Sequence, residues 1–313
     1  MTATHALPIS LLRPVAAPRP ARLRSTSPHL LLVANGNASG LTRRPSLFAD
    51  SVQLLRTVGA RVETRLTTSL EELDDALATA ERRVVLLGGD GSLHAAANSP
   101  YRAELALIPA GGANNVARSL GVPTDFAAAA RLAVEGAAQP LDAIAVEDGA
   151  TRYLAVEGVS AGFHAIARAN YTSVNSTDRR AALRAGLKAV AGFEPFTAAL
   201  SLDGSCRLGR IGQVFVVNTP LFGPGLRVAP ADPADGLLDV VTIDAGRRAL
   251  LSMVPRLRRG THLGRPGVTH ARARTVRIAT RGRSPIIADT TTFGDTVELS
   301  VVPHALDVVG AAA

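Results

Sequence analysis

The run Leu86-Leu87-Gly88-Gly89-Asp90-Gly91-Ser92 predicts a turn that leads from a buried strand into a helix. Glycines let the backbone approach a ligand closely, and the N–H groups that begin a helix bind anions. Asp90 follows the strand at its carboxyl end, where a carboxylate is placed to help bind Mg²⁺ or to polarise a hydroxyl. The run therefore indicates a phosphate site, although an ordinary strand-to-helix turn capped by a solvated Asp90 also fits it.

This loop differs from a P-loop. The sequence has no Gly-x-x-x-x-Gly-Lys-Ser/Thr motif, and its one lysine, Lys188, has no glycine loop before it. If ATP binds at residues 88–92, backbone amides and arginines have to provide the interactions that a loop lysine would supply.

Around this loop, strand-like and helix-like segments alternate. Strands are expected at residues 29–34, 61–66, 83–87 and 104–108, and helices at residues 46–58, 69–80, 116–120, 124–135 and after Ser92. The helix at 69–80 opens with Ser69 and carries Glu72 three residues later, as in a capping box. Alternation of this kind predicts a parallel sheet with helices on both faces, so residues 28–140 are expected to form a Rossmann-like α/β nucleotide-binding domain.

After residue 140 the pattern changes to one dominated by strands. These are expected at residues 141–146, 152–156, 196–202, 213–217, 237–243, 275–279 and 297–302, with helices only at 179–191 and 247–259. Strands without regular crossover helices predict an antiparallel, β-sandwich-like second domain over residues 141–313. The last strand is a candidate to return to the first domain, and the active site is expected in the cleft between the domains.

Composition limits the class of protein. The chain has 313 residues, of which 47 % are apolar, so it is long enough for two cores, and global disorder is excluded. No apolar run approaches the roughly 18 residues that suggest a membrane span. The single cysteine, Cys206, excludes an internal disulfide framework and a multi-cysteine metal site, and favours a cytoplasmic setting.

The charge is basic, with 34 basic and 26 acidic residues and a net charge of +8. Such a balance favours anionic partners, namely nucleotide phosphates, nucleic acid or acidic lipid headgroups, and a solvated arginine surface explains it equally well. Residues 1–27 hold four prolines and four arginines without an acidic residue, so we expect a disordered basic tail rather than a secretory signal.

Five segments, in order along the chain, resemble the motifs of diacylglycerol kinases, sphingosine kinases and related bacterial lipid kinases. The loop at 88–92 resembles their Gly-Gly-Asp-Gly-Thr nucleotide loop. The others are residues 35–40, similar to Asn-Pro-x-Ala-Ser-Gly; 109–118, similar to Pro-x-Gly-Thr-x-Asn-Asp-x-Ala-Arg; 218–240, similar to a second-domain signature; and 289–306, similar to the closing strands. The resemblance covers residues 29–309, and five ordered motifs are far more specific than one loop.

The resemblance implies a Mg²⁺-dependent transfer of the γ-phosphate of ATP to a lipid hydroxyl. By that resemblance, Asp90 and Asp289 are the catalytic candidates, and Asp232, Asp235 and Leu237 match a loop that binds a structural Mg²⁺. For Asp235 and Gly236, a plain turn before a buried strand is an equally simple interpretation. The residues that match the ATP site are Asn35, Ser39, Thr67 (or its neighbour Thr68), Gly88, Gly89, Asp90, Gly91, Ser92, Gly111, Gly112 and Asn114.

Several positions depart from the family pattern. The catalytic glutamate that follows the matching aspartate by two residues falls on Thr291, which cannot act as a general base at neutral pH. The other departures are Thr290 for glycine, Gly112 for threonine, Asn115 for aspartate, Ala95 for glutamate and His164 for aspartate. Asp289, Asp90 or His164 then remain to receive the proton, although a lone histidine is more often structural.

Three further interpretations follow from these observations. A kinase that phosphorylates NAD shares the Gly-Gly-Asp-Gly loop and a two-domain plan, and the loss of a glutamate at Thr291 fits a silent nucleotide- or lipid-binding protein. Nucleic-acid binding is not expected, because tryptophan is absent and aromatic residues make up only 4 %. For a lipid kinase, arginines in the C-terminal half favour peripheral docking on the anionic inner membrane face; they are Arg256, Arg258, Arg259, Arg265, Arg272, Arg274, Arg277, Arg281 and Arg283.

Overall fold

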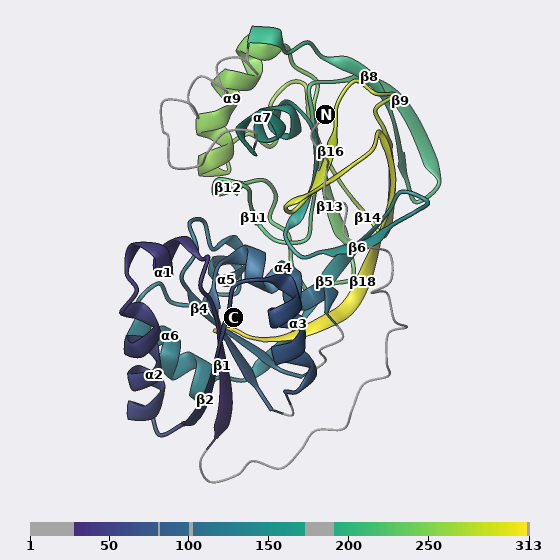
Figure 1. Cartoon of the computed structure of the whole chain (residues 1–313). Coiled ribbons are helices and arrows are strands. Elements are labelled where there is room, and N and C mark those ends of the chain that lie inside the picture. The colour runs from purple at the N-terminus through teal and green to yellow at the C-terminus, as the bar shows by residue number, and fades with distance from the viewer. Residues whose placement is uncertain (1–27, 81, 100–102, 173–190, 312–313) are drawn as a thin grey trace, which may run out of the picture.

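The chain forms two lobes joined by a long C-terminal strand, as the computed structural model in Figure 1 shows. The structure describes residues 28–80, 82–99, 103–172 and 191–311. The expected N-terminal tail, and almost all of the helix expected at 179–191, lie outside these described residues.

The first lobe contains a parallel sheet. Its strands are β1 (His29–Asn35), β2 (Arg61–Thr67), β3 (Val84–Gly88) and β4 (Leu105–Pro109), in the order β2-β1-β3-β4. The helices are α1 (Ser39–Arg43), α2 (Leu47–Thr57), α3 (Leu70–Ala78), α4 (Asp90–Asn98), α5 (Asn115–Ser119) and α6 (Phe126–Glu135). One or two helices follow each strand and pack against the sheet, as the alternating sequence pattern predicts.

Two apolar clusters cover the two faces of this sheet. Leu86 belongs to the cluster shared with α3 and α4, whereas its neighbour Leu87 belongs to the cluster shared with α2 and α6. Strands buried on both faces explain why the apolar runs here are continuous rather than alternating. The start of α3 is fixed by Ser69, whose side chain accepts a hydrogen bond from the Glu72 N–H, as the capping pattern predicts.

The second lobe is a sandwich of two antiparallel layers. One layer continues the first sheet through β5 (Ala138–Glu147), β6 (Arg152–Ala155), β8 (Phe196–Leu202), β9 (Ser205–Ile211), β15 (Thr275–Ala279) and β18 (Thr296–Val309). The other has the order β14-β13-β10-β7-β16-β17, with bounds Val268–Ala273, Leu238–Ile243, Gln213–Val217, Gly158–Gly162, Ile286–Ala288 and Thr291–Phe293. Apolar side chains from both layers form one shared cluster between them.

Helices α7 (Phe163–Thr172) and α9 (Arg247–Arg259) cover the outer face of the six-stranded sheet, with the small hairpin of β11 (Leu221–Phe222) and β12 (Leu226–Arg227) beside them. In Figure 1 this hairpin lies at the side of the second lobe that faces the first lobe. Among the residues that the structure describes, none of the helices combines the length and the apolar character needed to cross a membrane.

Strand β18 physically connects the lobes. Its last part pairs in parallel with β4 at Val308 and Leu105, while most of its length pairs antiparallel with β5. The register shifts between Val302 and Leu306, and this irregularity separates the part of β18 in each lobe. A rigid shared strand holds the carboxyl edge of the parallel sheet opposite the turns of the sandwich.

Candidate functional site

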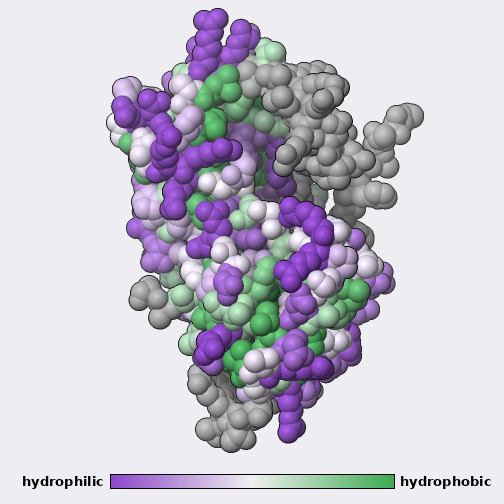
Figure 2. Space-filling view, turned by 90° about the vertical axis from the view of Figure 1, so that its left-hand side faces the viewer, coloured by the Kyte–Doolittle hydropathy of each residue, from purple (hydrophilic) through white to green (hydrophobic). Residues whose placement is uncertain are grey.

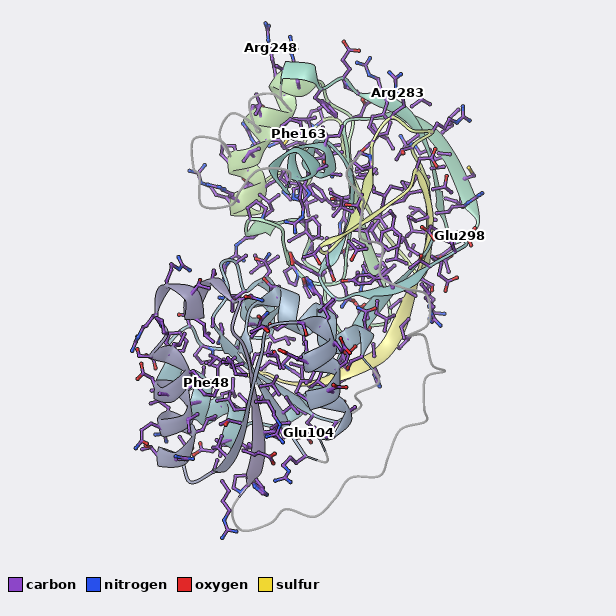
Figure 3. The ribbon with its side chains drawn as sticks, in the orientation of Figure 1. Phe48, Glu104, Phe163, Arg248, Arg283 and Glu298 are labelled. Carbon is purple, nitrogen blue, oxygen red and sulfur yellow. The ribbon has the colours of Figure 1, made fainter. Side chains whose placement is uncertain are left out.

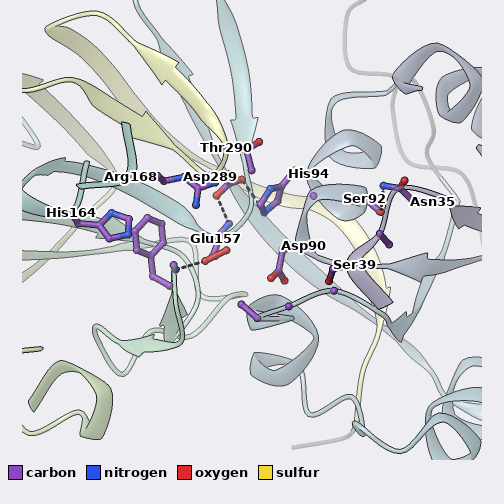
Figure 4. Close-up of a pocket in the computed structure, with 18 residues that line it drawn as sticks. Asn35, Ser39, Asp90, Ser92, His94, Glu157, His164, Arg168, Asp289 and Thr290 are labelled. Carbon is purple, nitrogen blue, oxygen red and sulfur yellow. Dashed lines mark hydrogen bonds and ion pairs between the residues drawn. The ribbon is translucent and has the colours of Figure 1, made fainter. Parts of the chain in front are cut away.

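A pocket of about 310 Å³ lies between the lobes (Figure 4). Both lobes contribute to its wall. The first lobe supplies Asn35, Ala38, Ser39, Gly89, Asp90, Gly91, Ser92, His94, Gly111, Gly112 and Ala113, and the second supplies Glu157, His164, Arg168, Phe222, Gly223, Asp289 and Thr290. We call these two sets the first wall and the second wall.

The first wall is made at the carboxyl ends of β1, β3 and β4, which is where ligands bind in open α/β sheets. Helix α4 begins at Asp90, directly after β3, so its N-terminal end faces the pocket. Gly91 and Gly112 line the pocket, and a Cβ atom added to either would meet no atom within 4 Å. At these two glycines the wall is bare backbone with room in front of it, which fits a phosphate chain bound by main-chain amides.

Close packing of glycine backbones holds the first wall together. A Cβ on Gly89 would lie 2.8 Å from the Gly111 Cα, and one on Gly111 would lie 2.5 Å from the Gly89 Cα. A Cβ on Gly40 would lie 2.4 Å from the Ala110 carbonyl oxygen, which accepts a hydrogen bond from the Gly40 N–H. Any larger residue at these positions would push the three loops apart.

Asp90 ties two of these loops to each other. Its Oδ2 accepts a hydrogen bond from the Asn115 N–H and its Oδ1 accepts one from the Val116 N–H, both at 3.0 Å. These are the first amides of α5, so Asp90 caps a helix other than its own. A carboxylate held in this way still offers lone pairs to water molecules on a magnesium ion.

The remaining predicted nucleotide residues fall into two groups. Asn35, Ser39 and Ser92 line the pocket, and the Asn35 amide donates to the Ser92 hydroxyl at 3.3 Å. Thr67 is buried and donates to the Ala34 carbonyl, so its hydroxyl is used inside the lobe. Outside the lining set, Gly88 packs its backbone against the Ser92 side chain, and Asn114 accepts a hydrogen bond from the Gly111 N–H in a left-handed conformation with φ of 49°.

On the second wall, Asp289 occupies the turn between β16 and β17. Its carboxylate accepts three backbone N–H groups, from Val156, Glu157 and Gly158, at 2.8 to 3.1 Å. The side chain is fully buried and the residue has φ of 48°, which is strained for a residue other than glycine. Burial raises the pKa of Asp289, while the neighbouring His94 and the three N–H donors lower it.

Glu157 follows β6 and is the second buried carboxylate of this wall. Its Oε1 accepts hydrogen bonds from the Gly223 N–H at 2.6 Å and from the Asn115 side-chain amide at 2.8 Å. Burial first, and then the charges of Asp90 and Asp289, raise the pKa of Glu157 well above its ordinary value. Three carboxylates therefore come close together at one end of the pocket.

His94, on α4, completes this cluster. Its Nε2 lies 3.3 Å from the Asp289 Oδ2, and neither ring nitrogen makes a hydrogen bond although the residue is only 3 % exposed. One atom each from His94, Glu157 and Asp289 lie within 4.8 Å of one another. A metal ion held by all three would have to compete with the three N–H groups on Asp289, and Mg²⁺ prefers oxygen ligands to imidazole.

His164 and Arg168 reach the pocket from α7. The Ser160 hydroxyl lies 2.9 Å from His164 Nδ1, and the ring packs against Phe215 and Phe222. Burial, and then the nearby Arg168 charge, lower the pKa of His164 to about 4. His164 is therefore a weak base that is neutral near pH 7, and Arg168 adds a positive charge to a pocket rich in carboxylates.

The loop matched to a structural Mg²⁺ lies outside the pocket. Asp232 accepts the Ala234 N–H, and Asp235 accepts the Leu237 N–H through Oδ1. The Oδ2 of Asp235 forms an ion pair with Arg272, so a guanidinium supplies the positive charge at this carboxylate. Magnesium bound by Asp232, Asp235 and the Leu237 carbonyl stays a prediction, and it requires Arg272 to move away from Asp235.

Sequence reasoning did not find Glu157 or His94. The signal for Glu157 was its position, since it is the only charged residue in the otherwise apolar or small run 153–162. A carboxylate that interrupts a buried run needs partners or a function. His94 had only the weaker signal of a histidine one turn after the glycine loop.

Two family models match the chain. The diacylglycerol kinase catalytic domain matches residues 29–146, and the YegS C-terminal NAD kinase beta sandwich-like domain matches residues 157–310. A protein named diacylglycerol kinase from Mycobacterium tuberculosis (strain ATCC 25618 / H37Rv) is 30 % identical over 255 residues, which cover 75 % of this chain and 78 % of that protein. A protein named "Probable lipid kinase YegS-like" from Shewanella frigidimarina (strain NCIMB 400) is 29 % identical over 230 residues, covering 69 % and 72 %.

A solved structure supports the same fold. The crystal structure of a diacylglycerol kinase from Bacillus anthracis str. Sterne superposes with a TM-score of 0.66 at 17 % identity, covering 92 % of this chain and 98 % of that one. The predicted fold, an α/β lobe followed by a β-sandwich-like lobe, is confirmed. The chain belongs to the diacylglycerol kinase family of lipid kinases.

Proposed function

We propose that this protein transfers the γ-phosphate of ATP to the hydroxyl of a diacylglycerol-like or related lipid in the pocket between the lobes. One observation carries the proposal: a glycine-backbone wall at the end of a parallel sheet faces a cluster of buried carboxylates across the same pocket. Phosphoryl transfer depends mainly on positioning and electrostatic stabilisation. In this proposal the first wall positions the nucleotide, and the second wall provides the carboxylates and the entry for the lipid.

The first wall is the proposed nucleotide site. The 88–92 loop and the N-terminal end of α4 would bind the phosphates, with Asn35, Ser39, Gly111 and Gly112 around them. Gly88 and Asn114 support the loops from behind, and Thr67 supports the end of β2. Asp90 keeps the loops together and faces the pocket, which makes it the first-wall candidate for an indirect contact with Mg²⁺.

A magnesium ion fits near Asp90, held through water molecules, and when bound it would neutralise charge on the phosphate oxygens of ATP. Asp90 and a bound triphosphate would both present negative charge at the end of β3, which supports a cation there. Asp289 has all its carboxylate contacts inside the protein, so its proposed part in catalysis is to hold the backbone of residues 156–158.

The lipid is proposed to enter from the second lobe, where Phe222 and Gly223 line the pocket. Peripheral docking on an anionic membrane from the cytoplasmic side is supported by exposed arginines on α9 and on the strands and turns after it. Figure 3 labels Arg248 and Arg283 at the outer end of the second lobe, and long hydrophilic side chains project there in Figure 2. Positive charge of this kind strengthens attraction to anionic lipid.

The experiment is label transfer from γ-labelled ATP and Mg²⁺ into a total lipid extract, with the products separated by chromatography. We expect a labelled lipid, whose identity then names the substrate. Parallel reactions with NAD as the only acceptor test the remaining enzyme hypothesis, because one matched family model is described as NAD kinase beta sandwich-like. ATP binding without label transfer to lipid or NAD would overturn the proposal in favour of a silent binding protein.

A further inference from the structure

We propose that Glu157 is the catalytic base of this kinase, and that its carboxylate acts in place of the glutamate missing at Thr291. The inference rests on the proposed lipid kinase function and adds to it the residue that takes the proton from the lipid hydroxyl. Three observations support it: the position of Glu157 in the pocket, the hydrogen bonds that orient its side chain, and the contacts that the other candidate bases already make.

Glu157 lies just after β6, and Thr291 begins β17 directly after the turn at Asp289; these two segments are bound to each other. The Asp289 N–H donates to the Gly158 carbonyl at 2.9 Å. The Asp289 carboxylate accepts the backbone N–H groups of Val156, Glu157 and Gly158. The segment that begins at Asp289 therefore touches the backbone at Glu157 directly. A carboxylate lost from one turn can be replaced by a side chain from the other, because both turns border the same pocket.

The Glu157 side chain is oriented for use. Its Oε1 is held by two donors, the Gly223 N–H and the Asn115 amide, while Oε2 makes no hydrogen bond with the described part of the protein. The residue is only 5 % exposed and lines the pocket. One oxygen thus fixes the carboxylate and the other is free to accept a proton, which is the arrangement that general base catalysis needs.

In the other carboxylates of the pocket, each oxygen already accepts a hydrogen bond from the backbone. Both oxygens of Asp90 accept amides of α5, and both oxygens of Asp289 accept backbone N–H groups. His164 faces Ser160 and has a pKa lowered to about 4. His94 directs Nε2 at Asp289, 3.3 Å away. Glu157 is the one carboxylate lining the pocket, within the described residues, that keeps an oxygen for the substrate.

In the proposed step, proton transfer from the lipid hydroxyl is coupled to transfer of the γ-phosphate. The lipid oxygen forms a bond to the γ-phosphorus while its proton passes to the Glu157 Oε2. The bond between the γ-phosphorus and the oxygen that bridges to the β-phosphate breaks, and ADP leaves with the electron pair. Glu157 then loses the proton to solvent through the open pocket, which completes the cycle.

The electrostatic surroundings suit this role. Burial, Asp90 and Asp289 raise the pKa of Glu157, and a base works best when its pKa lies near the working pH. His94 on α4, and His164 and Arg168 on α7, are the cationic or ionisable groups that face the same pocket from the other elements. We therefore expect kcat/KM to rise with pH along a titration that lies above the ordinary range of a glutamate.

The test compares the wild-type protein with Glu157→Gln and with Glu147→Gln. Glutamine keeps an oxygen for the Gly223 and Asn115 donors, so Glu157→Gln loses only the basic oxygen. Glu147 lies at the end of β5, half-exposed beside Arg152 and outside the pocket, and is the matched control. Label transfer from γ-labelled ATP to the lipid extract is measured over a pH series, together with ATP binding and thermal unfolding.

We expect Glu157→Gln to lose at least about 100-fold in label transfer, with ATP binding and folding retained and the pH dependence of the residual activity removed. Glu147→Gln should behave as wild type. Full transfer by a folded Glu157→Gln variant would overturn the assignment while leaving the kinase function intact. A 100-fold loss with an unchanged pH profile would also overturn it, because a purely structural role would not need the titrating oxygen. No transfer by the wild-type protein would overturn the proposed function, and this inference with it.

Discussion

The first wall of the pocket presents backbone from loops that each continue a single strand, whereas the second wall presents side chains gathered from separate turns. Gly88, Gly89 and Gly91 lie within four consecutive residues, and their role follows from local geometry. Glu157 and Asp289 are far apart in the chain and meet only because β7 pairs with β16. Phosphate binding can thus be encoded in a short motif, while the placement of carboxylates depends on the packing of a whole lobe.

Removal of the Asp289 carboxylate should have the largest effect on the second wall. Asp289→Ala leaves three buried N–H groups without an acceptor, and each costs about 1–3 kcal/mol, so we expect a loss of about 3 kcal/mol or more in the free energy of unfolding. Denaturant unfolding measures it.

Asp203 offers a matched control for this change. It also has a positive φ and accepts two backbone N–H groups, from Arg274 and Thr275, but it is exposed. Asp203→Ala should cost much less, because water can replace the carboxylate. Equal losses in the two variants would show that burial of the second wall is not what makes Asp289 important.

The first wall should respond to added volume rather than to lost charge. Gly111→Ala places a Cβ 2.5 Å from the Gly89 Cα and 2.7 Å from the Asn114 Oδ1, so we expect a loss of about 1–3 kcal/mol in stability together with weaker ATP binding. Gly112→Ala is the neighbouring control, since its Cβ meets no atom within 4 Å, and it should fold as the wild type does. Unchanged stability and ATP binding in Gly111→Ala would contradict the close packing of the loops.

A smaller effect, on how stability depends on pH, is expected from Glu157 in the second wall. Because the pKa of Glu157 is raised in the folded protein, folding retains a proton there, and stability falls as pH rises above the ordinary glutamate pKa of about 4.3. Glu157→Gln removes this penalty, so the variant should gain in unfolding temperature relative to the wild type, and the gain should grow from pH 4 to pH 8. Thermal unfolding over that range measures it, and a gain that shrinks with rising pH would contradict the raised pKa.

The smallest expected effect lies outside both walls, at Asp235. Arg272→Ala removes the ion pair with Asp235 and a longer contact of 3.8 Å with Asp239, and since Arg272 itself is partly exposed the change should cost about 1 kcal/mol. The freed carboxylate should then bind Mg²⁺ more readily, so added Mg²⁺ should raise the unfolding temperature more in the variant than in the wild type. An identical response to Mg²⁺ in both proteins would show that Arg272 does not compete with a metal at this loop.

The same contrast explains how far the sequence could be interpreted. Continuous apolar runs and turn glycines predicted β1, β3 and β4 and the loop at 88–92, because these signals are local. Strand β10 was predicted with its observed bounds and α9 likewise. Strands β16 and β17 are only three residues long, and β7 consists mainly of glycine, serine and alanine, so none of them gives a recognisable pattern. They are stabilised by pairing within the sandwich.

The candidate site divides in the same way. Most nucleotide residues inferred from the motif line the pocket, but the use of the Thr67 hydroxyl inside the lobe depends on the Ala34 carbonyl in a neighbouring strand. The three N–H groups on Asp289 come from residues more than a hundred positions earlier, and no local pattern predicts them. Glu157 was detectable only as a carboxylate inside an apolar run. Its position in the pocket could not be predicted without the fold.

A structure with a non-hydrolysable ATP analogue, Mg²⁺ and a short-chain diacylglycerol would test the central claim most directly, that the two walls form one phosphoryl-transfer site. The account predicts the triphosphate along the 88–92 loop, with the γ-phosphate pointing across the pocket and the lipid hydroxyl within hydrogen-bond reach of the Glu157 Oε2. A nucleotide bound away from this loop, or a lipid hydroxyl that lies against another residue with Glu157 turned from it, would contradict the account.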